Sequence, residues 1–216
     1  AVTGFGNVAW GVMKKSSQLG GKVTYLSGPN CYVHDEEGVT TDEKLNFILE
    51  LRRKNEIDLK SYADKFNCEY HSGEKFWGVK DVDIYMPCAT QNEVGIEEAK
   101  KIVDSGVKYY IEVANMPTTN DALQYMMAQK NMIVAPSKAV NAGGVAVSGL
   151  EMSQNSERLA WSAEEVDSKL QGIMANIYKN ISAAAKKYGM EGNYVAGANI
   201  AGFLKVAEAM QAQGIV

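Results

Sequence analysis

Ala1-Val2-Thr3-Gly4-Phe5-Gly6-Asn7-Val8-Ala9 opens the chain and decides the expected fold. The first three residues have the character of the end of an apolar strand, and a glycine turn follows at once. Gly4 permits a tight turn, Gly6 lets a diphosphate approach the backbone, and Ala9 is small enough for close packing of helix on strand. Strand, turn and helix in this order predict a dinucleotide-binding turn with phosphates at the helix N-terminus. A glycine-rich turn without a ligand is the alternative.

The first strand is short for a buried parallel strand, which typically has about five residues. The glycine turn already begins at position 4. We therefore expect this chain to be part of a longer protein, with residues ahead of Ala1.

Composition narrows the class of protein and of partner. The 216 residues suit one large domain, or one domain with an appendage. A net charge of -4 gives no electrostatic reason to expect nucleic acid, and no apolar run approaches the length of about 18 residues expected of a membrane span. The three cysteines are far apart, which favours a reducing, cytoplasmic location. We therefore expect a small-molecule partner, with no nucleic acid and no membrane.

Apolar and turn residues alternate along the first two thirds of the chain. Helices are expected at about 7–19, from Thr40 with Glu43 at capping-box spacing, and at 59–66, 96–104 and 119–129. Expected strands lie at 1–3, 23–26, 82–86, 109–113 and 132–135. This order predicts an α/β fold with a doubly wound, mostly parallel, Rossmann-like sheet that helices cover on both faces.

The last third is expected to be helical. Ser162 and Glu165 have capping-box spacing at the start of a long helix with an apolar stripe, and a final helix occupies much of 195–211. We expect a dinucleotide-binding Rossmann domain over residues 1–150 and C-terminal helices over residues 151–216.

Loops at the carboxyl ends of the strands should carry the ligand site. The second strand ends in Leu26-Ser27-Gly28-Pro29-Asn30, where an acidic residue would bind the adenosine ribose and a basic one a 2'-phosphate. Neither is present, so NAD is favoured and NADP is possible. The alternative is that Gly28-Pro29 only makes a turn.

Amide and hydroxyl side chains cluster in the later loops. Thr90, Gln91, Asn92 and Asn115 could hold the nicotinamide half of a cofactor, although such residues also occur in ordinary loops. Residues 141–148 are expected to form a glycine-containing loop that suits an anionic ligand or a tight interhelical turn.

Four reactive side chains are given structural interpretations. His34 and His71 lack metal-ligand spacing and are expected at the surface or in loops. Cys88 has no nearby His and is interpreted as a packing residue. Lys138 lies in a candidate ligand loop, but a solvated surface lysine is at least as good an interpretation as a functional one. We therefore expect no metal site.

Five separated motifs resemble the hexameric bacterial type of glutamate dehydrogenase and appear in that family's order. The motifs are Gly4 to Ala9, Pro87 to Asn92, Tyr110 to Pro117, Pro136 to Val145 and Glu151 to Ser156. The resemblance covers almost the whole chain. It implies the coenzyme-binding domain, with C-terminal helices that pack on it and on an N-terminal substrate domain that this chain lacks.

The resemblance also implies roles for individual residues. Val145 and Ser148 would form the glutamate pocket, with Ser148 at the side-chain carboxylate. Asn30 departs from the acidic residue common in NAD-preferring relatives, which puts strict NAD preference in doubt. The cofactor would contact Gly4, Phe5, Gly6, Asn7, Val8, Ser27, Pro29, Asn30, Ala89, Thr90, Gln91, Asn115 and Asn141.

The activity implied by the resemblance is the reversible oxidation of L-glutamate to 2-oxoglutarate and ammonia by hydride transfer to NAD(P). The family's catalytic lysines and aspartate lie in the absent domain. We therefore expect no catalytic residue in this chain, no turnover by it alone, and a homohexamer for the full-length protein. The alternatives are a dehydrogenase of an apolar amino acid, whose pocket would have no carboxylate to bind, and a free-standing nucleotide-binding module without catalysis.

Overall fold

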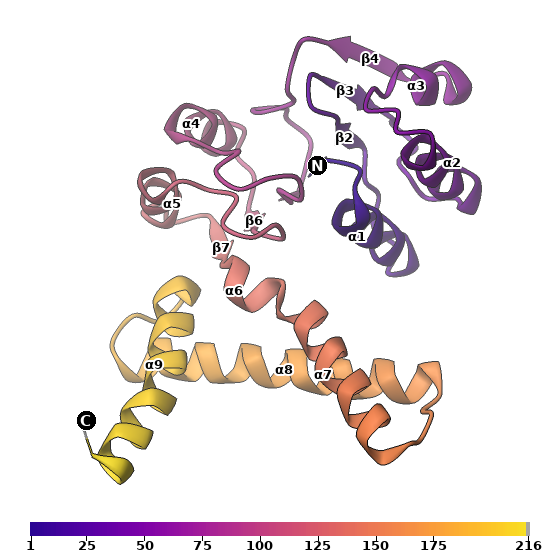
Figure 1. Cartoon of the computed structure of the whole chain (residues 1–216). Helices are drawn as coiled ribbons and strands as arrows, with labels where there is room; N and C mark the ends of the chain where they lie inside the picture. Colours follow the sequence, from indigo (N-terminus) through magenta and orange to yellow (C-terminus); the bar gives the residue numbers. More distant parts are fainter. Residues whose placement is uncertain (215–216) are drawn as a thin grey trace. The chain divides into compact units, whose positions relative to one another are not determined.

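The structure is a computed structural model that describes residues 1–214. The chain divides into two compact units, unit 1 (Ala1–Met132) and unit 2 (Ile133–Val216). The division into domains at residue 150 stays a prediction. Unit 1 combines helices and strands, whereas the described part of unit 2 is mainly helical; in Figure 1 the colours of unit 1 begin at indigo and those of unit 2 run from orange to yellow.

The strands of unit 1 belong to two sheets and form parallel and antiparallel pairs. They are β1 (Val2–Thr3), β2 (Tyr25–Ser27), β3 (Cys31–His34), β4 (Glu69–Ser72), β5 (Ile84–Tyr85) and β6 (Tyr109–Ile111). The pairs β1–β2 and β5–β6 are parallel, whereas β2–β3 and β3–β4 are antiparallel. A parallel bridge between Val2 and Met86 joins the two groups of strands. The predicted parallel strands are therefore confirmed in place, although each is shorter than expected.

Strands β3 and β4 are not among the predicted strands. The chain turns back immediately after β2, because the Gly28 N–H donates to the Cys31 carbonyl at 2.9 Å and Ser27 pairs with Tyr32. Pro29 and Asn30 are thus the two tip residues of a β-hairpin. A two-residue connection joins antiparallel strands, whereas parallel strands need a longer crossover. The sequence pattern alone predicts this turn as the end of a βαβ unit and does not indicate the hairpin.

Helices of unit 1 follow the predicted positions closely. They are α1 (Asn7–Gln18), α2 (Asp42–Arg53), α3 (Lys60–Phe66), α4 (Ile96–Asp104) and α5 (Asn120–Met127). The predicted cap of α2 is wrong by one residue, because the Thr41 hydroxyl, and not that of Thr40, accepts from the Lys44 N–H at 3.3 Å. Helices α1 and α2 pack together, as do α4 and α5 (Figure 1).

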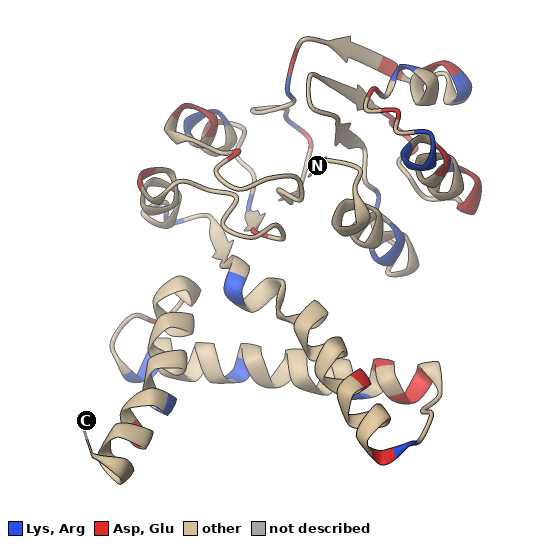
Figure 2. Ribbon diagram, viewed as in Figure 1, with Lys and Arg blue, Asp and Glu red and all other residues tan. Residues whose placement is uncertain are grey.

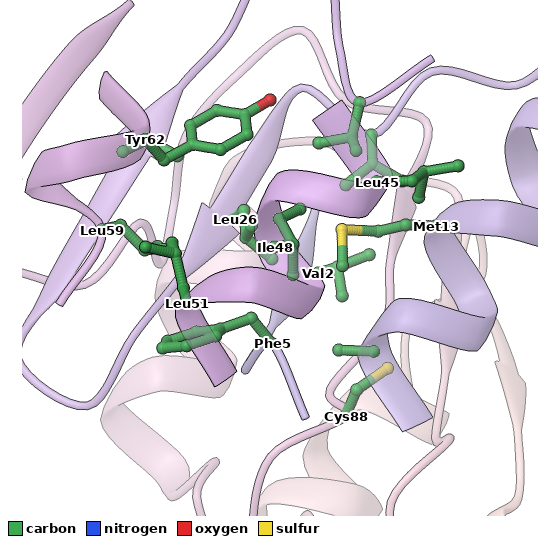
Figure 3. Packing of buried hydrophobic residues seen from close by; sticks show 14 of the residues in the cluster. Val2, Phe5, Met13, Leu26, Leu45, Ile48, Leu51, Leu59, Tyr62 and Cys88 are labelled. Carbon is green, nitrogen blue, oxygen red and sulfur yellow. The ribbon is translucent and has the colours of Figure 1, made fainter. Parts of the chain in front are cut away.

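The core of unit 1 holds the glycine turn in place. Met13 of α1 extends toward Val2 and Leu45 (Figure 3), and Val2, Met13 and Ile48 are almost wholly buried. Phe5, inside the turn itself, belongs to the same cluster. Burial of such side chains stabilises the fold by about 1.5 to 3 kcal/mol each. Hydrophobic packing therefore fixes the start of α1 relative to β1.

Unit 2 is mainly helical. It comprises β7 (Ile133–Ala135), α6 (Ser137–Val140), α7 (Ala142–Glu157), α8 (Ala163–Lys187) and α9 (Tyr194–Gln213). The capping box of Ser162 and Glu165 is confirmed, with the Glu165 N–H donating to the Ser162 hydroxyl at 3.2 Å.

The expected loop at 141–148 is wrong: Ala142 begins α7, so Gly143, Gly144 and Ser148 are helical. Two adjacent glycines indicated a loop, but contacts with α8 outweigh their weak helix propensity.

Gly197 makes the contact between α8 and α9 possible. A Cβ at this position would lie 2.2 Å from the Ile181 carbonyl oxygen and 3.1 Å from the Ala185 Cβ. We expect Gly197→Ala to lower the free energy of unfolding by about 2 kcal/mol, since overpacking against backbone forces the helices apart. On the same helix, a Cβ added to Gly202 would meet no described atom within 4 Å, so Gly202→Ala is the control and should be neutral or stabilising. Urea denaturation of both variants measures the difference, and equal stabilities would contradict the packing argument.

Candidate nucleotide-binding site

The glycine turn after β1 has the geometry that its sequence predicts. Gly4 adopts a φ of +75°, and its N–H donates to the Ser27 carbonyl at 2.8 Å. A Cβ on Gly4 would lie only 3.0 Å from the Ala89 Cβ. Both the backbone conformation and the close approach favour glycine at this position.

The N-terminus of α1 is open to a ligand. Gly6 is the N-cap residue, and a Cβ built on it meets no described atom within 4 Å. The first N–H groups of a helix have no intrahelical acceptor, and the helix dipole places a partial positive charge there. The first turn begins Asn7-Val8-Ala9 and has no carboxylate to compete for these groups. In Figure 2 the beginning of α1 accordingly has no red segment, the colour of Asp and Glu. The arrangement can bind a phosphate group.

Side chains around this helix start have distinct places. The Asn7 side-chain oxygen accepts a hydrogen bond from the Arg52 guanidinium of α2. Val8 is about half exposed, whereas Ala9 is fully buried, as close helix packing requires. The burial of Ala9 agrees with its predicted role, which is to let α1 pack closely on β1.

A cavity of about 890 Å³ lies at this end of unit 1. This volume falls in the range of about 300 to 1,000 Å³ usual for ligand sites. The cavity brings together three predicted segments that are far apart in sequence: the turn after β1, the β2–β3 hairpin and the loop after β5. The predicted residues that line it are Gly4, Phe5, Gly6, Pro29, Ala89 and Thr90.

Lys75 holds the hairpin at the tip of β2. Its ammonium donates to the Gly28 carbonyl at 2.5 Å, and partial burial lowers the pKa of this lysine. Ser27 is fully buried, and its hydroxyl has no hydrogen-bond partner among the described residues. Pro29 and Asn30 are exposed. Lys75 and Arg52 both line the cavity, and sequence reasoning missed them because each comes from a segment without a recognisable motif.

Glu93 connects the loop after β5 to the end of β1. Its carboxylate Oε1 accepts from the Thr3 hydroxyl at 2.8 Å and from the Ala89 N–H at 3.1 Å. Burial raises the pKa of Glu93, while the hydrogen bonds and the charge of Lys75 oppose that increase. Sequence reasoning missed Glu93 too, although it directly follows the motif Pro87 to Asn92.

The loops after β5 and β6 lie against each other. The Asn92 N–H donates to the Met116 carbonyl at 3.0 Å, and the Val94 N–H donates to the Pro117 carbonyl at 3.0 Å. Thr90, Gln91, Asn92 and Asn115 are exposed on these loops. The structure therefore brings Asn115 into the neighbourhood of the loop that contains Thr90 and Gln91.

Three predicted residues belong to unit 2. Asn141 lies between α6 and α7, while Val145 and Ser148 are exposed and three residues apart on α7. Side chains at this spacing share one helix face. The Ser148 hydroxyl donates to the Gly144 carbonyl at 3.3 Å, and so remains a local, exposed group.

The remaining reactive residues have structural partners. His34 and His71 lie on β3 and β4 and not in loops, and Glu69 approaches them at 3.2 and 3.6 Å. Burial raises the pKa of the Cys88 thiol to about 12, which makes it a poor nucleophile at neutral pH. Lys138 donates to the Asn199 side chain. Among the described residues, no group of three or more His, Cys, Asp or Glu side chains is arranged to hold a metal ion.

Comparisons with known proteins give consistent results. The NAD-specific glutamate dehydrogenase of Clostridium symbiosum is 63% identical over 215 residues, which are 100% of this chain and 48% of that protein. The NADP-specific glutamate dehydrogenase of Haemophilus influenzae is 47% identical over 220 residues, 100% of this chain and 47% of that protein. A solved glutamate dehydrogenase structure has a TM-score of 0.96 at 62% identity and covers 100% of this chain and 48% of that one.

The chain thus spans about half the length of the curated relatives it matches. No helix in the described residues 1–214 is both long and apolar enough to cross a membrane. The profile of the family described as Glutamate/Leucine/Phenylalanine/Valine dehydrogenase matches residues 1–214. The chain therefore belongs to the Glutamate/Leucine/Phenylalanine/Valine dehydrogenase family.

Proposed function

We propose that this chain is the coenzyme-binding part of a glutamate dehydrogenase that converts L-glutamate to 2-oxoglutarate and ammonia with NAD. The observation that carries the proposal is the start of α1, where Gly6 leaves backbone N–H groups open beside the large cavity. Such a helix start suits the diphosphate of a dinucleotide. The names of the relatives and the family membership support the choice of reaction.

The described residues fit a dinucleotide of this kind. When bound, the cofactor supplies a nicotinamide that accepts a hydride, and the protein supplies position and electrostatics. Gly4, Phe5, Gly6, Asn7 and Val8 would hold the diphosphate through the turn and helix start. The remaining proposed contacts are Ser27, Pro29 and Asn30 at the adenosine ribose, Ala89, Thr90, Gln91 and Asn115 at the nicotinamide half, and Asn141 at its border with the substrate.

NAD is the proposed cofactor, and NADP is the alternative. The β2–β3 hairpin tip carries Asn30, which neither repels a 2'-phosphate nor pairs with it as a cation would. Relatives named as NAD-specific and as NADP-specific both match the chain, and the NAD-specific one cited above has the higher identity. We also propose that the sheet is the doubly wound Rossmann type, with the β3–β4 pair as an antiparallel extension.

Parallel titrations of the purified chain with NAD and NADP test the cofactor proposal. We expect NAD to bind more tightly. A chain that binds neither nucleotide would contradict the proposed role of the glycine turn, and tighter binding of NADP would reverse the cofactor assignment.

Substrate choice is proposed to depend on Val145 and Ser148 of α7. In the full-length protein, Ser148→Ala is expected to raise the KM for glutamate about tenfold with little change in kcat, because one hydrogen bond to a carboxylate is lost. Ser153→Ala is the matched control: its hydroxyl lies on the same helix and likewise donates to the carbonyl four residues earlier, at 3.0 Å. Unchanged glutamate kinetics in Ser148→Ala would exclude Ser148 from the glutamate pocket.

Turnover is proposed to require the other half of the protein. Glutamate has two carboxylates that need cationic partners, and its oxidation needs a proton acceptor beside the reacting carbon. We propose that a separate substrate domain supplies these groups and that the full-length protein is a cytoplasmic homohexamer. Free thiols at Cys31, Cys68 and Cys88 support a reducing compartment. A native mass near that of this chain alone, instead of a much larger assembly, would favour a free-standing binding module.

A further inference from the structure

Glu93 is a partly buried carboxylate in the nucleotide cavity, and the proposed binding contacts give it no role. Its Oε1 atom accepts two hydrogen bonds, from the Thr3 hydroxyl at 2.8 Å and from the Ala89 N–H at 3.1 Å. The Thr3 hydroxyl accepts in turn from the Cys88 N–H at 2.8 Å. Burying a carboxylate costs free energy unless hydrogen bonds compensate for it, and this carboxylate is compensated by two different segments.

The polarity of this network is fixed. The Cys88 N–H donates to the Thr3 oxygen, and the Thr3 hydroxyl donates to Oε1 of Glu93. The Ala89 backbone N–H, which can only donate, also donates to Oε1. The atom at the position of Oε1 must therefore accept. Lys75, which also lines the cavity, attracts the carboxylate electrostatically.

The donors lie at the end of β1 and in the loop after β5, on the two sides that a dinucleotide would have to bridge. Thr3 immediately precedes Gly4 in the turn after β1, and Ala89 lies in the loop after β5. These loops already touch, because a Cβ on Gly4 would lie 3.0 Å from the Ala89 Cβ. A shift of either loop would therefore change the distance between the proposed diphosphate and nicotinamide contacts.

We propose that Glu93 is a positioning residue that fixes the loop after β5 against the glycine turn, and so controls affinity for the whole dinucleotide but not for its adenosine diphosphate half. This inference rests on the proposed function. Neither the glycine motif nor the family resemblance assigns a role to Glu93. The inference adds that one carboxylate oxygen sets the distance between the glycine turn and the loop after β5.

The experiment compares the dissociation constants of NAD and ADP for this chain. ADP carries the adenosine and diphosphate but lacks the nicotinamide riboside, whose proposed contacts are in the loop after β5. Glu93→Ala is expected to weaken NAD binding about tenfold, through loss of the hydrogen bonds to a charged group, and to leave ADP binding unchanged. Glu93→Gln should restore most of the NAD affinity, because its amide oxygen can replace Oε1 as the acceptor.

Glu97→Ala is the matched control, because Glu97 is exposed on α4 and pairs with Lys100. Equal weakening of NAD and ADP in Glu93→Ala, or unchanged NAD affinity, would overturn the positioning role. Failure of Glu93→Gln to recover NAD binding would also overturn it, since charge and not the acceptor would then matter. A wild-type chain that binds neither ligand would instead contradict the proposed function, and this inference with it.

Discussion

Gly6→Ala is expected to weaken NAD binding by about 10- to 100-fold while the fold remains intact. The new methyl group would project from the N-cap of α1 into space that contains no described atom within 4 Å. It would therefore meet the ligand and not the protein. Losing one or two hydrogen bonds between backbone N–H groups and a charged diphosphate accounts for a change of this size. Isothermal titration with NAD measures it.

Gly11→Ala is the control for Gly6→Ala. Gly11 lies five residues after Gly6, inside α1, and a Cβ there also has no described atom within 4 Å. We expect wild-type NAD affinity and slightly greater stability, because Ala favours the helix by up to about 1 kcal/mol over Gly. If Gly6→Ala and Gly11→Ala bind NAD equally well, the diphosphate does not lie at the start of α1.

Lys44→Met is expected to lower the free energy of unfolding of unit 1 by about 3 to 5 kcal/mol. The Lys44 ammonium lies 2.6 Å from the Asp35 carboxylate and 3.0 Å from the Gly38 carbonyl, and both charged residues are buried. The Tyr62 hydroxyl donates to the same carboxylate oxygen at 2.8 Å. Removing the lysine would leave Asp35 charged and buried with too few partners. Chemical denaturation followed by circular dichroism measures the loss.

Lys100→Met provides the comparison with an exposed ion pair. Lys100 lies 2.7 Å from Glu97, but about half of the lysine side chain and 70% of the glutamate side chain are exposed. Solvent screens such a pair, so Lys100→Met is expected to leave the free energy of unfolding nearly unchanged. If Lys44→Met and Lys100→Met lost similar free energies of unfolding, burial would not explain how much the Asp35–Lys44 pair stabilises the protein.

Local sequence signals predicted the features that depend on neighbouring residues. The glycine turn, the position of α1 and the capping box of Ser162 follow from backbone freedom, apolar periodicity and short-range hydrogen bonds. The same signals failed where distant segments decide the structure. Residues 142–148 contain two adjacent glycines yet form part of α7, since packing against another helix offsets a weak intrinsic propensity.

The sequence by itself determined that a strand, a glycine turn and a helix follow one another, because each needs only residues that are adjacent in the chain. It also identified the family, through five motifs in order. Only the tertiary structure decided that β3 returns antiparallel to β2 and that Lys75, Arg52 and Glu93 line one cavity with Gly4 and Gly6. These residues come from separate segments, and a hydrogen bond such as that between Thr3 and Glu93, 90 positions apart, exists only once hydrophobic packing has brought the segments together.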